Sequence, residues 1–219
     1  MKVLLDIFKS VDLLQQAFDE SVEMLETDLK MFVASRNSLR KSETGEIKID
    51  IRAEDAKINQ YERDVRRKVL VHMTTTESKD IVFGLILVSI VIDIERIGDY
   101  TKNIMDLAIS HTAKLAAGEF EEKVTILENN ISKRFRDLIE AFKESSIEKA
   151  RNVMRNHKEQ TDGCEAITKE LIVKNHTSLP CCDAVTLALY LRFLKRVRSH
   201  LTNIASGIVN PFDRIGFME

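Results

Sequence analysis

The sequence has few of the residues that interrupt regular structure. Its 219 residues include two prolines, seven glycines and no tryptophan. Because proline and glycine are the main breakers of helices, this scarcity predicts long uninterrupted segments and favours an all-α protein. The 44% hydrophobic content is too high for a disordered chain and ordinary for a globular one.

The sequence also lacks the features of several other protein classes. A formal net charge of −2 gives no reason to expect nucleic-acid binding. The three cysteines show no CxxC or Cys/His zinc spacing, which indicates reduced structural thiols. The apolar run Val82–Ile92 is too short to cross a bilayer, which needs ~20 residues, so it predicts a core helix surrounded by other helices. With no signal peptide evident at the start, we expect a cytoplasmic protein.

Apolar residues recur at helical spacing along most of the chain. The segment Ser42–Asp50, which contains Gly45, interrupts this pattern and is interpreted as a linker. Capping boxes, Gly118 and the prolines then mark the ends of the segments. We expect six helices: Leu4–Phe32, about Arg52–His72, Thr74 to about Ala117, one carrying Val124–Phe142, Ser145 to about Lys174, and Ser178–Asn210.

The chain contains an internal repeat. The segment IERIGDYTKNI at Ile94–Ile104 aligns with LKRVRSHLTNI at Leu194–Ile204, an offset of 100 residues. We therefore expect two three-helix units, residues 1–118 and 119–219. A unit of this size would bury its central helix poorly alone, so both are expected to pack into one six-helix bundle.

The first copy of this segment carries two carboxylates one helical turn apart. Glu95 and Asp99 stand at positions i and i+4, so they can converge on one hard cation. Two ligands do not make a tight site, so neighbouring residues would have to complete it. The alternative is a solvated acidic face that pairs with Arg96 or Lys102.

The ERIGDYTKNI stretch, in the third helix of a doubled three-helix unit, resembles the motif of the PhoU family of phosphate-uptake regulators. The family motif is ERxxD followed by Asn, matched here by Glu95, Arg96, Asp99 and Asn103. The resemblance implies a cytoplasmic regulator that binds a phosphate ABC transporter and its partner sensor kinase. It also implies that the motif binds iron or other metal ions. Residues of the second helix would add ligands, and the candidates are Asp55, Asn59 and Glu62.

The second copy of the motif departs from this pattern. Lys195 and Ser199 stand where Glu95 and Asp99 stand in the first copy. An ammonium group cannot ligate a metal and a lone hydroxyl is a poor ligand, so we expect the second metal site to be absent. The basic residues around Lys195 are interpreted as surface charge or as partners in internal pairing. The remaining secondary candidates for ligands in this repeat are Asp162, Glu165, His200 and Asn203.

Three functions fit these features. The first is a non-enzymatic adaptor that docks on a phosphate transporter or its sensor kinase, with a metal ion at Glu95 and Asp99. The second is a metal-dependent enzyme, which would need an enclosed pocket with a general base near the carboxylates. The third is a structural helical protein that dimerises through its long first helix. An open carboxylate face suits binding better than catalysis, so we favour the first.

Overall fold

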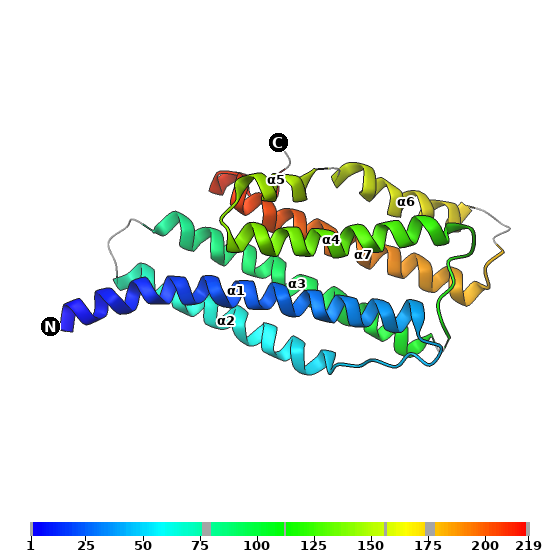
Figure 1. The fold of residues 1–219 in the computed structure, drawn as a ribbon, viewed down its shortest axis with the longest axis horizontal. Helices are drawn as coiled ribbons and strands as arrows, with labels where there is room; N and C mark the ends of the chain where they lie inside the picture. Colours follow the sequence, from blue (N-terminus) through cyan, green and yellow to red (C-terminus); the bar gives the residue numbers. More distant parts are fainter. Residues whose placement is uncertain (1, 76–79, 112, 156, 174–177, 218–219) are drawn as a thin grey trace.

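A computed structural model of the chain describes residues 2–75, 80–111, 113–155, 157–173 and 178–217. The side chains of residues 2–12 and 157–162 are outside this description. All regular structure in the described residues is helical, and the long helices lie side by side along one axis (Figure 1). The helices are α1 (Lys2–Lys41), α2 (Ile51–Thr75), α3 (Ile81–Ser110), η1 (Gly118–Phe120), α4 (Glu121–Lys143), α5 (Ile147–Met154), α6 (His157–Val173), α7 (Cys181–Val209) and η2 (Phe212–Arg214).

The predicted all-α bundle with an internal repeat is confirmed. α1, α2 and α3 pack on one another, α4, α5 and α6 pack against α7, and α3 packs on α7 between the two groups. α3 and α7 begin 100 residues apart, and each position of 91–100 has the same burial class as its counterpart in 191–200. The buried core runs through both helices, as with Ile94 and Ile97 of α3 and Leu194 and Val197 of α7.

The two repeats meet in antiparallel fashion along α3 and α7. Asp93 contacts His200 through a 2.6 Å hydrogen bond, and Tyr100 lies 6.2 Å from Phe193 between ring centroids. Replacing each residue of the first contact by its counterpart 100 residues away gives the residue pair of the second contact. This relation is expected when two repeats are related by a two-fold pseudo-axis. Tyr100 also stacks on His200, its own counterpart, with ring centroids 5.6 Å apart.

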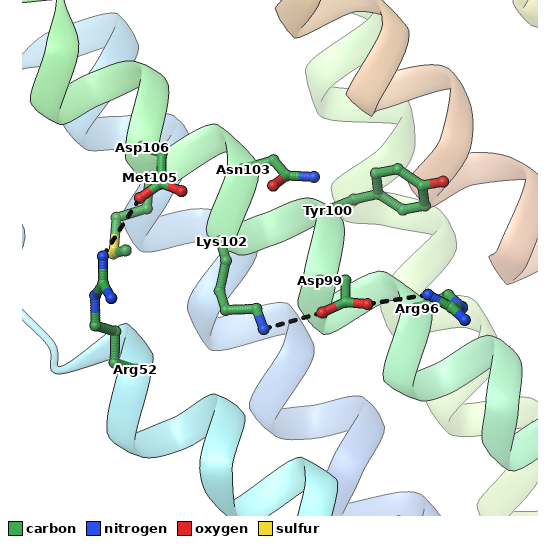
Figure 2. A pocket seen from close by; sticks show the side chains of 8 residues that line it. All are labelled: Arg52, Arg96, Asp99, Tyr100, Lys102, Asn103, Met105 and Asp106. Carbon is green, nitrogen blue, oxygen red and sulfur yellow. Dashed lines mark hydrogen bonds and ion pairs between the residues drawn. The ribbon is translucent and has the colours of Figure 1, made fainter.

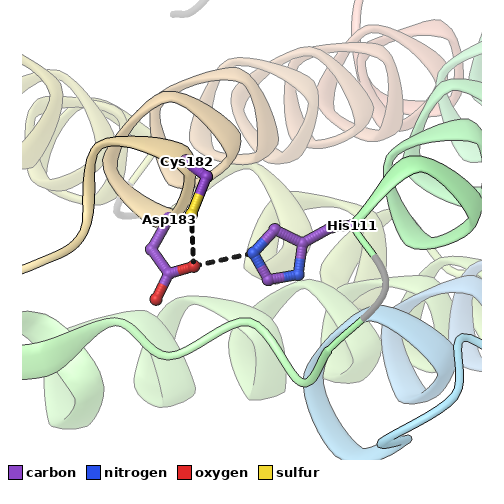
Figure 3. A group of neighbouring side chains, drawn as sticks. All are labelled: His111, Cys182 and Asp183. Atoms are coloured by element: carbon purple, nitrogen blue, oxygen red, sulfur yellow. Dashed lines mark hydrogen bonds and ion pairs between the residues drawn. The ribbon is translucent and has the colours of Figure 1, made fainter.

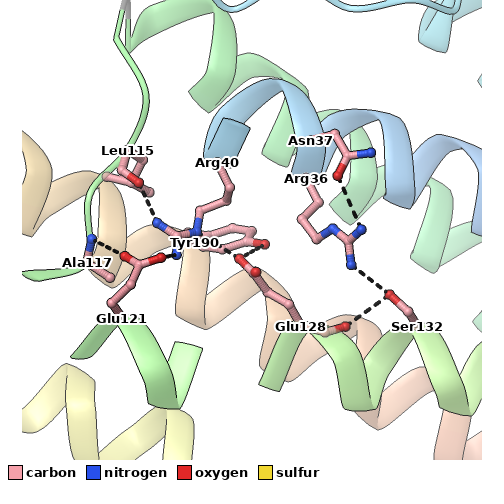
Figure 4. Close-up of polar contacts among 9 residues, drawn as sticks. All are labelled: Arg36, Asn37, Arg40, Leu115, Ala117, Glu121, Glu128, Ser132 and Tyr190. Atoms are coloured by element: carbon pink, nitrogen blue, oxygen red, sulfur yellow. Dashed lines mark hydrogen bonds and ion pairs between the residues drawn. The ribbon is translucent and has the colours of Figure 1, made fainter. Parts of the chain in front are cut away.

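A buried ionic network joins α1 of the first repeat to α4 and α7 of the second (Figure 4). The guanidinium of Arg40 donates to Glu128 (2.9 Å), to Glu121 (2.5 Å) and to the carbonyl of Leu115. The hydroxyl of Tyr190 donates to the same oxygen of Glu128 at 2.8 Å. Glu128 is therefore a buried carboxylate with two donors.

The predicted fifth helix is divided in the structure into α5 and α6. Arg155 leaves the helical conformation, with φ −58° and ψ 149°. The guanidinium of Arg134 donates to the carbonyls of Val153 and Arg155, so it takes acceptors that a continuous helix would use itself. The described residues therefore form seven α-helices rather than six.

Other predicted boundaries also shift. α1 continues past Phe32 to Lys41, and α3 ends at Ser110 rather than near Ala117. Thr74 was expected to cap α3, but it belongs to α2, where its hydroxyl donates to the carbonyl of Val71. Glu77, which stands three residues after Thr74 and would complete a capping box with it, lies outside the described residues.

The prediction that the apolar start of α3 is surrounded by other helices is wrong. Ile81, Val82, Phe83, Leu85 and Ile92 are between 37% and 60% exposed. Only one face of this part of α3 packs on its neighbours, so the remaining apolar side chains meet solvent. No helix in the described residues is long and apolar enough to span a membrane.

Candidate functional site

Four carboxylates from three helices of the first repeat lie close together: Asp28 of α1, Asp55 of α2, and Glu95 and Asp99 of α3. We call this group the acidic cluster. Each of the other three carboxylates raises the pKa of Asp28 electrostatically. Gly98 eases the approach, because a Cβ there would lie only 3.2 Å from Oδ1 of Asp28.

Asp28 is the most unusual member of the acidic cluster. It is fully buried, and neither of its carboxylate oxygens has a hydrogen-bond partner among the described residues. Burial raises the pKa of Asp28 well above its ordinary value, and the charges of Asp55, Glu95 and Asp99 raise it further. A buried carboxylate without a donor destabilises the fold unless a proton or a cation neutralises it.

The ammonium group of Lys102 supplies part of the missing positive charge (Figure 2). It donates to Asp99 at 2.9 Å, as the figure shows, and to Asp55, which is not drawn there, at 2.8 Å. Burial lowers the pKa of Lys102, but these hydrogen bonds and the negative charges of Asp55 and Asp99 together raise it by more, so the net pKa is raised. Arg96 makes a second, longer ion pair with Asp99 at 3.3 Å.

Glu95 is less well compensated than Asp99. Burial raises the pKa of Glu95, the charge of Asp99 raises it further, and the charge of Arg96 lowers it only in part. The distance between the Glu95 and Arg96 charged groups is 3.7 Å. Asp28 and Glu95 are therefore the members of the cluster that a proton or a cation would most readily neutralise.

The structure brings together most of the residues predicted for the first metal site. Asp55, Glu95 and Asp99 belong to the acidic cluster. Asn59 lies beside them and donates its amide to Asp55 at 3.1 Å. Glu62 lies at the edge, where it pairs with Arg66 at 2.8 Å and still raises the pKa of Glu95.

Asp28 was missed by the reasoning from the sequence. It lies three residues after Leu25 and four before Phe32, both buried residues of α1. A charged residue in register with an apolar stripe is the signal that could have identified it, because carboxylates are rarely fully buried without a partner.

The acidic cluster has the donor type that hard cations such as Fe³⁺, Mn²⁺ or Mg²⁺ prefer, but no three of its carboxylates have oxygens within 4.8 Å of one another, so they would have to draw together around an ion. Its donors are carboxylate oxygens, which these ions prefer, and the unpartnered carboxylate of Asp28 points to a missing positive charge. An open hollow of about 470 Å³ lies alongside, and Asp99 is the member of the cluster that lines it. Its lining residues are Arg52, Arg96, Asp99, Tyr100, Lys102, Asn103, Met105 and Asp106 (Figure 2).

The corresponding place in the second repeat has the opposite charge. Lys195 pairs with Glu165, and the hydroxyl of Ser199 donates to the carbonyl of Lys195. Arg198 stands at the position equivalent to Gly98 and is 1% exposed. The second repeat therefore buries a large cationic side chain where the first repeat has only a glycine.

The secondary candidates of the second repeat whose side chains are described, Glu165, His200 and Asn203, do not form one site. Nδ1 of His200 bonds to Asp93 at 2.6 Å, and the amide of Asn203 donates to the same carboxylate oxygen at 3.2 Å. These residues therefore join the repeats across the pseudo-axis, whereas Glu165 pairs with Lys195. The side chain of Asp162 lies outside the described residues.

Comparison with protein families agrees with the doubled architecture. The model of the PhoU domain matches the chain twice, over residues 21–108 and 124–208. The chain belongs to the PhoU family. Each match spans one repeat, and the first contains all four residues of the acidic cluster. The predicted boundary between the two repeats, at residues 118 and 119, falls between the two matches and stays a prediction.

Individual proteins are similar to this chain over most of its length. A Caulobacter vibrioides protein named "Phosphate-specific transport system accessory protein PhoU homolog" is 24% identical over 159 residues, which are 71% of this chain and 69% of the relative. The crystal structure of the phosphate transport system regulatory protein PhoU from Streptococcus pneumoniae matches with a TM-score of 0.72 at 20% identity, covering 93% of this chain and 94% of the other. PhoU from Pseudomonas aeruginosa gives a TM-score of 0.70 at 18% identity, with 93% and 95% coverage. Both structures show the same fold.

Proposed function

We propose that the chain is a cytoplasmic, non-enzymatic regulator of phosphate transport. It would act as an adaptor on a subunit of a phosphate ABC transporter, on the partner sensor kinase, or on both. The observation that carries this proposal is the match of both repeats to the PhoU domain, because the similar Caulobacter protein is named as an accessory of phosphate-specific transport.

The exposed apolar end of the first repeat supports an adaptor role. The end of α2 and the start of α3 expose a group of large apolar side chains between 37% and 64%: Leu70, Val71, Ile81, Val82, Phe83 and Leu85. Contiguous exposed apolar surface is a feature of protein-binding faces. This end is our proposed docking surface for a membrane-protein partner.

We further propose that the acidic cluster binds a hard metal ion, with iron as one candidate. Asp28, Asp55, Glu95 and Asp99 would hold it, with Asn59 beside them and Lys102 displaced from Asp55 and Asp99. The positive charge of the metal ion would neutralise carboxylates that come from three different helices. Binding would therefore tie α1, α2 and α3 together, which is a structural role and not a chemical one.

Transport measurements in cells test the regulatory function. In a strain lacking this protein, phosphate uptake should continue at high external phosphate, and expression of the intact chain should restore the restriction. The Glu95→Gln/Asp99→Asn variant should restore it poorly, and Lys195→Met/Ser199→Ala should restore it fully. Unchanged phosphate uptake and signalling after deletion would refute the regulatory role.

A further inference from the structure

A second cluster of ligand-type side chains lies where α3 ends and α7 begins, away from the acidic cluster (Figure 3). It consists of His111, the residue that follows α3, and Cys182 and Asp183 in the first turn of α7. In the described part of the chain, these three form the one group of His, Cys, Asp or Glu side chains whose ligand atoms all lie within 4.8 Å of one another. His111 comes from the first repeat, and the other two come from the second.

Two of the three distances between the ligand atoms can be compared directly with those of a tetrahedral zinc site. Nε2 of His111 lies 2.7 Å from Oδ1 of Asp183, and Sγ of Cys182 lies 3.6 Å from the same oxygen. Typical zinc–ligand bond lengths place nitrogen and oxygen about 3.3 Å apart, and sulfur and oxygen about 3.5 Å apart, in a tetrahedral site. A small opening of the His111–Asp183 pair would therefore admit the ion.

The imidazole of His111 is held in the orientation that a ligand needs. Its Nδ1 lies 2.6 Å from the carbonyl of Ala113 and donates to it, so Nε2 is left to face the other two residues. Metal-binding histidines commonly use their second ring nitrogen in this way, and the contact fixes the tautomer and the ring plane. The loop after α3 is itself anchored, because the N–H of Leu115 donates to the carbonyl of Leu39 at 2.9 Å and Arg40 donates to the Leu115 carbonyl.

The burial of the three residues leaves one side of the cluster open. The side chain of His111 is 9% exposed and that of Asp183 15%, whereas Cys182 is exposed. An ion held by these groups would have its fourth position toward solvent, where water or a ligand from a partner can bind.

We propose that His111, Cys182 and Asp183 form a binding site for a zinc-type divalent ion that joins the two repeats. The mixed nitrogen, sulfur and oxygen donors suit Zn²⁺ and Co²⁺, and the thiolate sets this site apart from the all-oxygen acidic cluster. On binding, the Cys182 thiol and the protonated nitrogen of His111 release their protons to solvent. Without metal, the His111–Asp183 contact remains as an ion pair between the ends of α3 and α7.

Cobalt titration of the full-length protein tests this site. The protein is first treated with a chelator and kept reduced with a phosphine, and Co²⁺ is then added while the absorption spectrum is recorded. A thiolate ligand gives a near-ultraviolet charge-transfer band, and tetrahedral geometry gives strong visible bands; excess Zn²⁺ should remove both. The oxygen ligands of the acidic cluster give no thiolate band, so the readout is specific to Cys182.

Cys181 provides a matched control, since it is also exposed and directly precedes Cys182. The third cysteine, Cys164, is buried, and burial raises the pKa of its thiol to about 11. Cys181→Ser should keep the cobalt spectrum. Cys182→Ser and His111→Gln should remove it and weaken Zn²⁺ binding by more than about 100-fold, because loss of a supporting group alone weakens metal binding about 10–100-fold.

Three other results would each contradict the proposed site. The wild-type protein could show no thiolate band, or Cys181→Ser could remove the band while Cys182→Ser keeps it. Retention of the band in His111→Gln would mean that a thiol alone holds the metal. Circular dichroism of each variant, which should match the wild type, separates loss of metal binding from loss of the fold.

Discussion

The third helices of the two repeats, α3 and α7, show how one backbone can carry opposite chemistry. Over residues 91–100 and 191–200 their burial is the same position by position, yet α3 presents Glu95 and Asp99 where α7 presents Lys195 and Ser199. Gly98 leaves space for the carboxylate of Asp28, whereas Arg198 places a buried cation at the equivalent position. The apolar positions thus preserve the packing, and the polar positions between them are free to diverge.

Two buried carboxylates extend the comparison. Glu128, in the second repeat, accepts hydrogen bonds from Arg40 and Tyr190. Asp28, in the first repeat, has no donor among the described residues. The same chemical group is therefore neutralised within the protein in one repeat and left for a proton or a metal ion in the other.

The largest expected effect comes from removing the partner of Glu128. Arg40→Ala leaves this carboxylate buried without its cation, and breaking a buried pair costs about 3–5 kcal/mol. Urea unfolding monitored by circular dichroism should show this loss. Arg36→Ala is the control, because Arg36 reaches the second repeat through the neutral hydroxyl of Ser132 at 3.0 Å; it should cost about 1 kcal/mol. Equal losses in the two variants would mean that the charge of Glu128 is not what Arg40 stabilises.

The opposite result is expected at Asp28. Asp28→Asn removes the cost of burying a carboxyl group that is ionised in the unfolded protein, so the metal-free variant should be more stable than the wild type at pH 7, by on the order of 1–3 kcal/mol. The measurement is urea unfolding in the presence of a chelator. A less stable variant would show that Asp28 has a favourable partner in the folded protein.

The pH dependence of stability should differ between the same two proteins. Because the pKa of Asp28 is higher in the folded than in the unfolded protein, protonation favours the fold. This contribution is fully present below about pH 4, the ordinary value for Asp, and is lost as the pH rises through the raised pKa of the folded state. Wild-type stability relative to Asp28→Asn should therefore increase as the pH is lowered; parallel curves would contradict the assignment.

Lys102 should compete with a metal ion for the acidic cluster. Lys102→Met removes the ammonium group from Asp55 and Asp99, so Mn²⁺ should bind about tenfold more tightly, which equals about 1.4 kcal/mol. Calorimetric titration gives the affinity. Weaker binding by Lys102→Met would place Lys102 among the groups that support the ion.

The smallest effect is expected at the equivalent positions of α7. Lys195→Met/Ser199→Ala removes a pair of which Glu165 is 57% and Lys195 35% exposed at the side chain, so stability should change by no more than about 1 kcal/mol. Thermal unfolding measures this change. A large loss would show that the second motif has a structural role that its contacts do not reveal.

The fold could be predicted from the sequence because, in a helix bundle, apolar residues spaced three or four apart mark the buried face of each helix. The 100-residue offset between Ile94–Ile104 and Leu194–Ile204 identified α3 and α7 as equivalent helices. Apolar spacing could not predict the division between α5 and α6, because the contacts at the break come from Arg134 of another helix. Nor could it predict the exposure of Val82 and its neighbours, since a continuous apolar run looks the same whether one or all of its faces are covered.

Only part of the candidate sites was visible in the sequence. Glu95 and Asp99 stood out because they are one turn apart on one helix. Asp28 lies on α1 and approaches them beside Gly98 of α3. This tertiary contact cannot be read from the sequence near either residue. His111 and Cys182 are distant in the sequence and show no zinc-binding spacing, so only the antiparallel packing of α3 and α7 brings them together.

Binding of Mn²⁺ by the full-length protein tests the difference between the repeats most directly. The titration is followed by electron paramagnetic resonance, which detects the free ion, on a Cys182→Ser background that excludes the thiolate. We predict saturable binding in this protein, its loss in Glu95→Gln/Asp99→Asn, and its retention in Lys195→Met/Ser199→Ala. Absence of binding at the start, or equal binding by both paired variants, would contradict the assignment of a cation site to the first repeat.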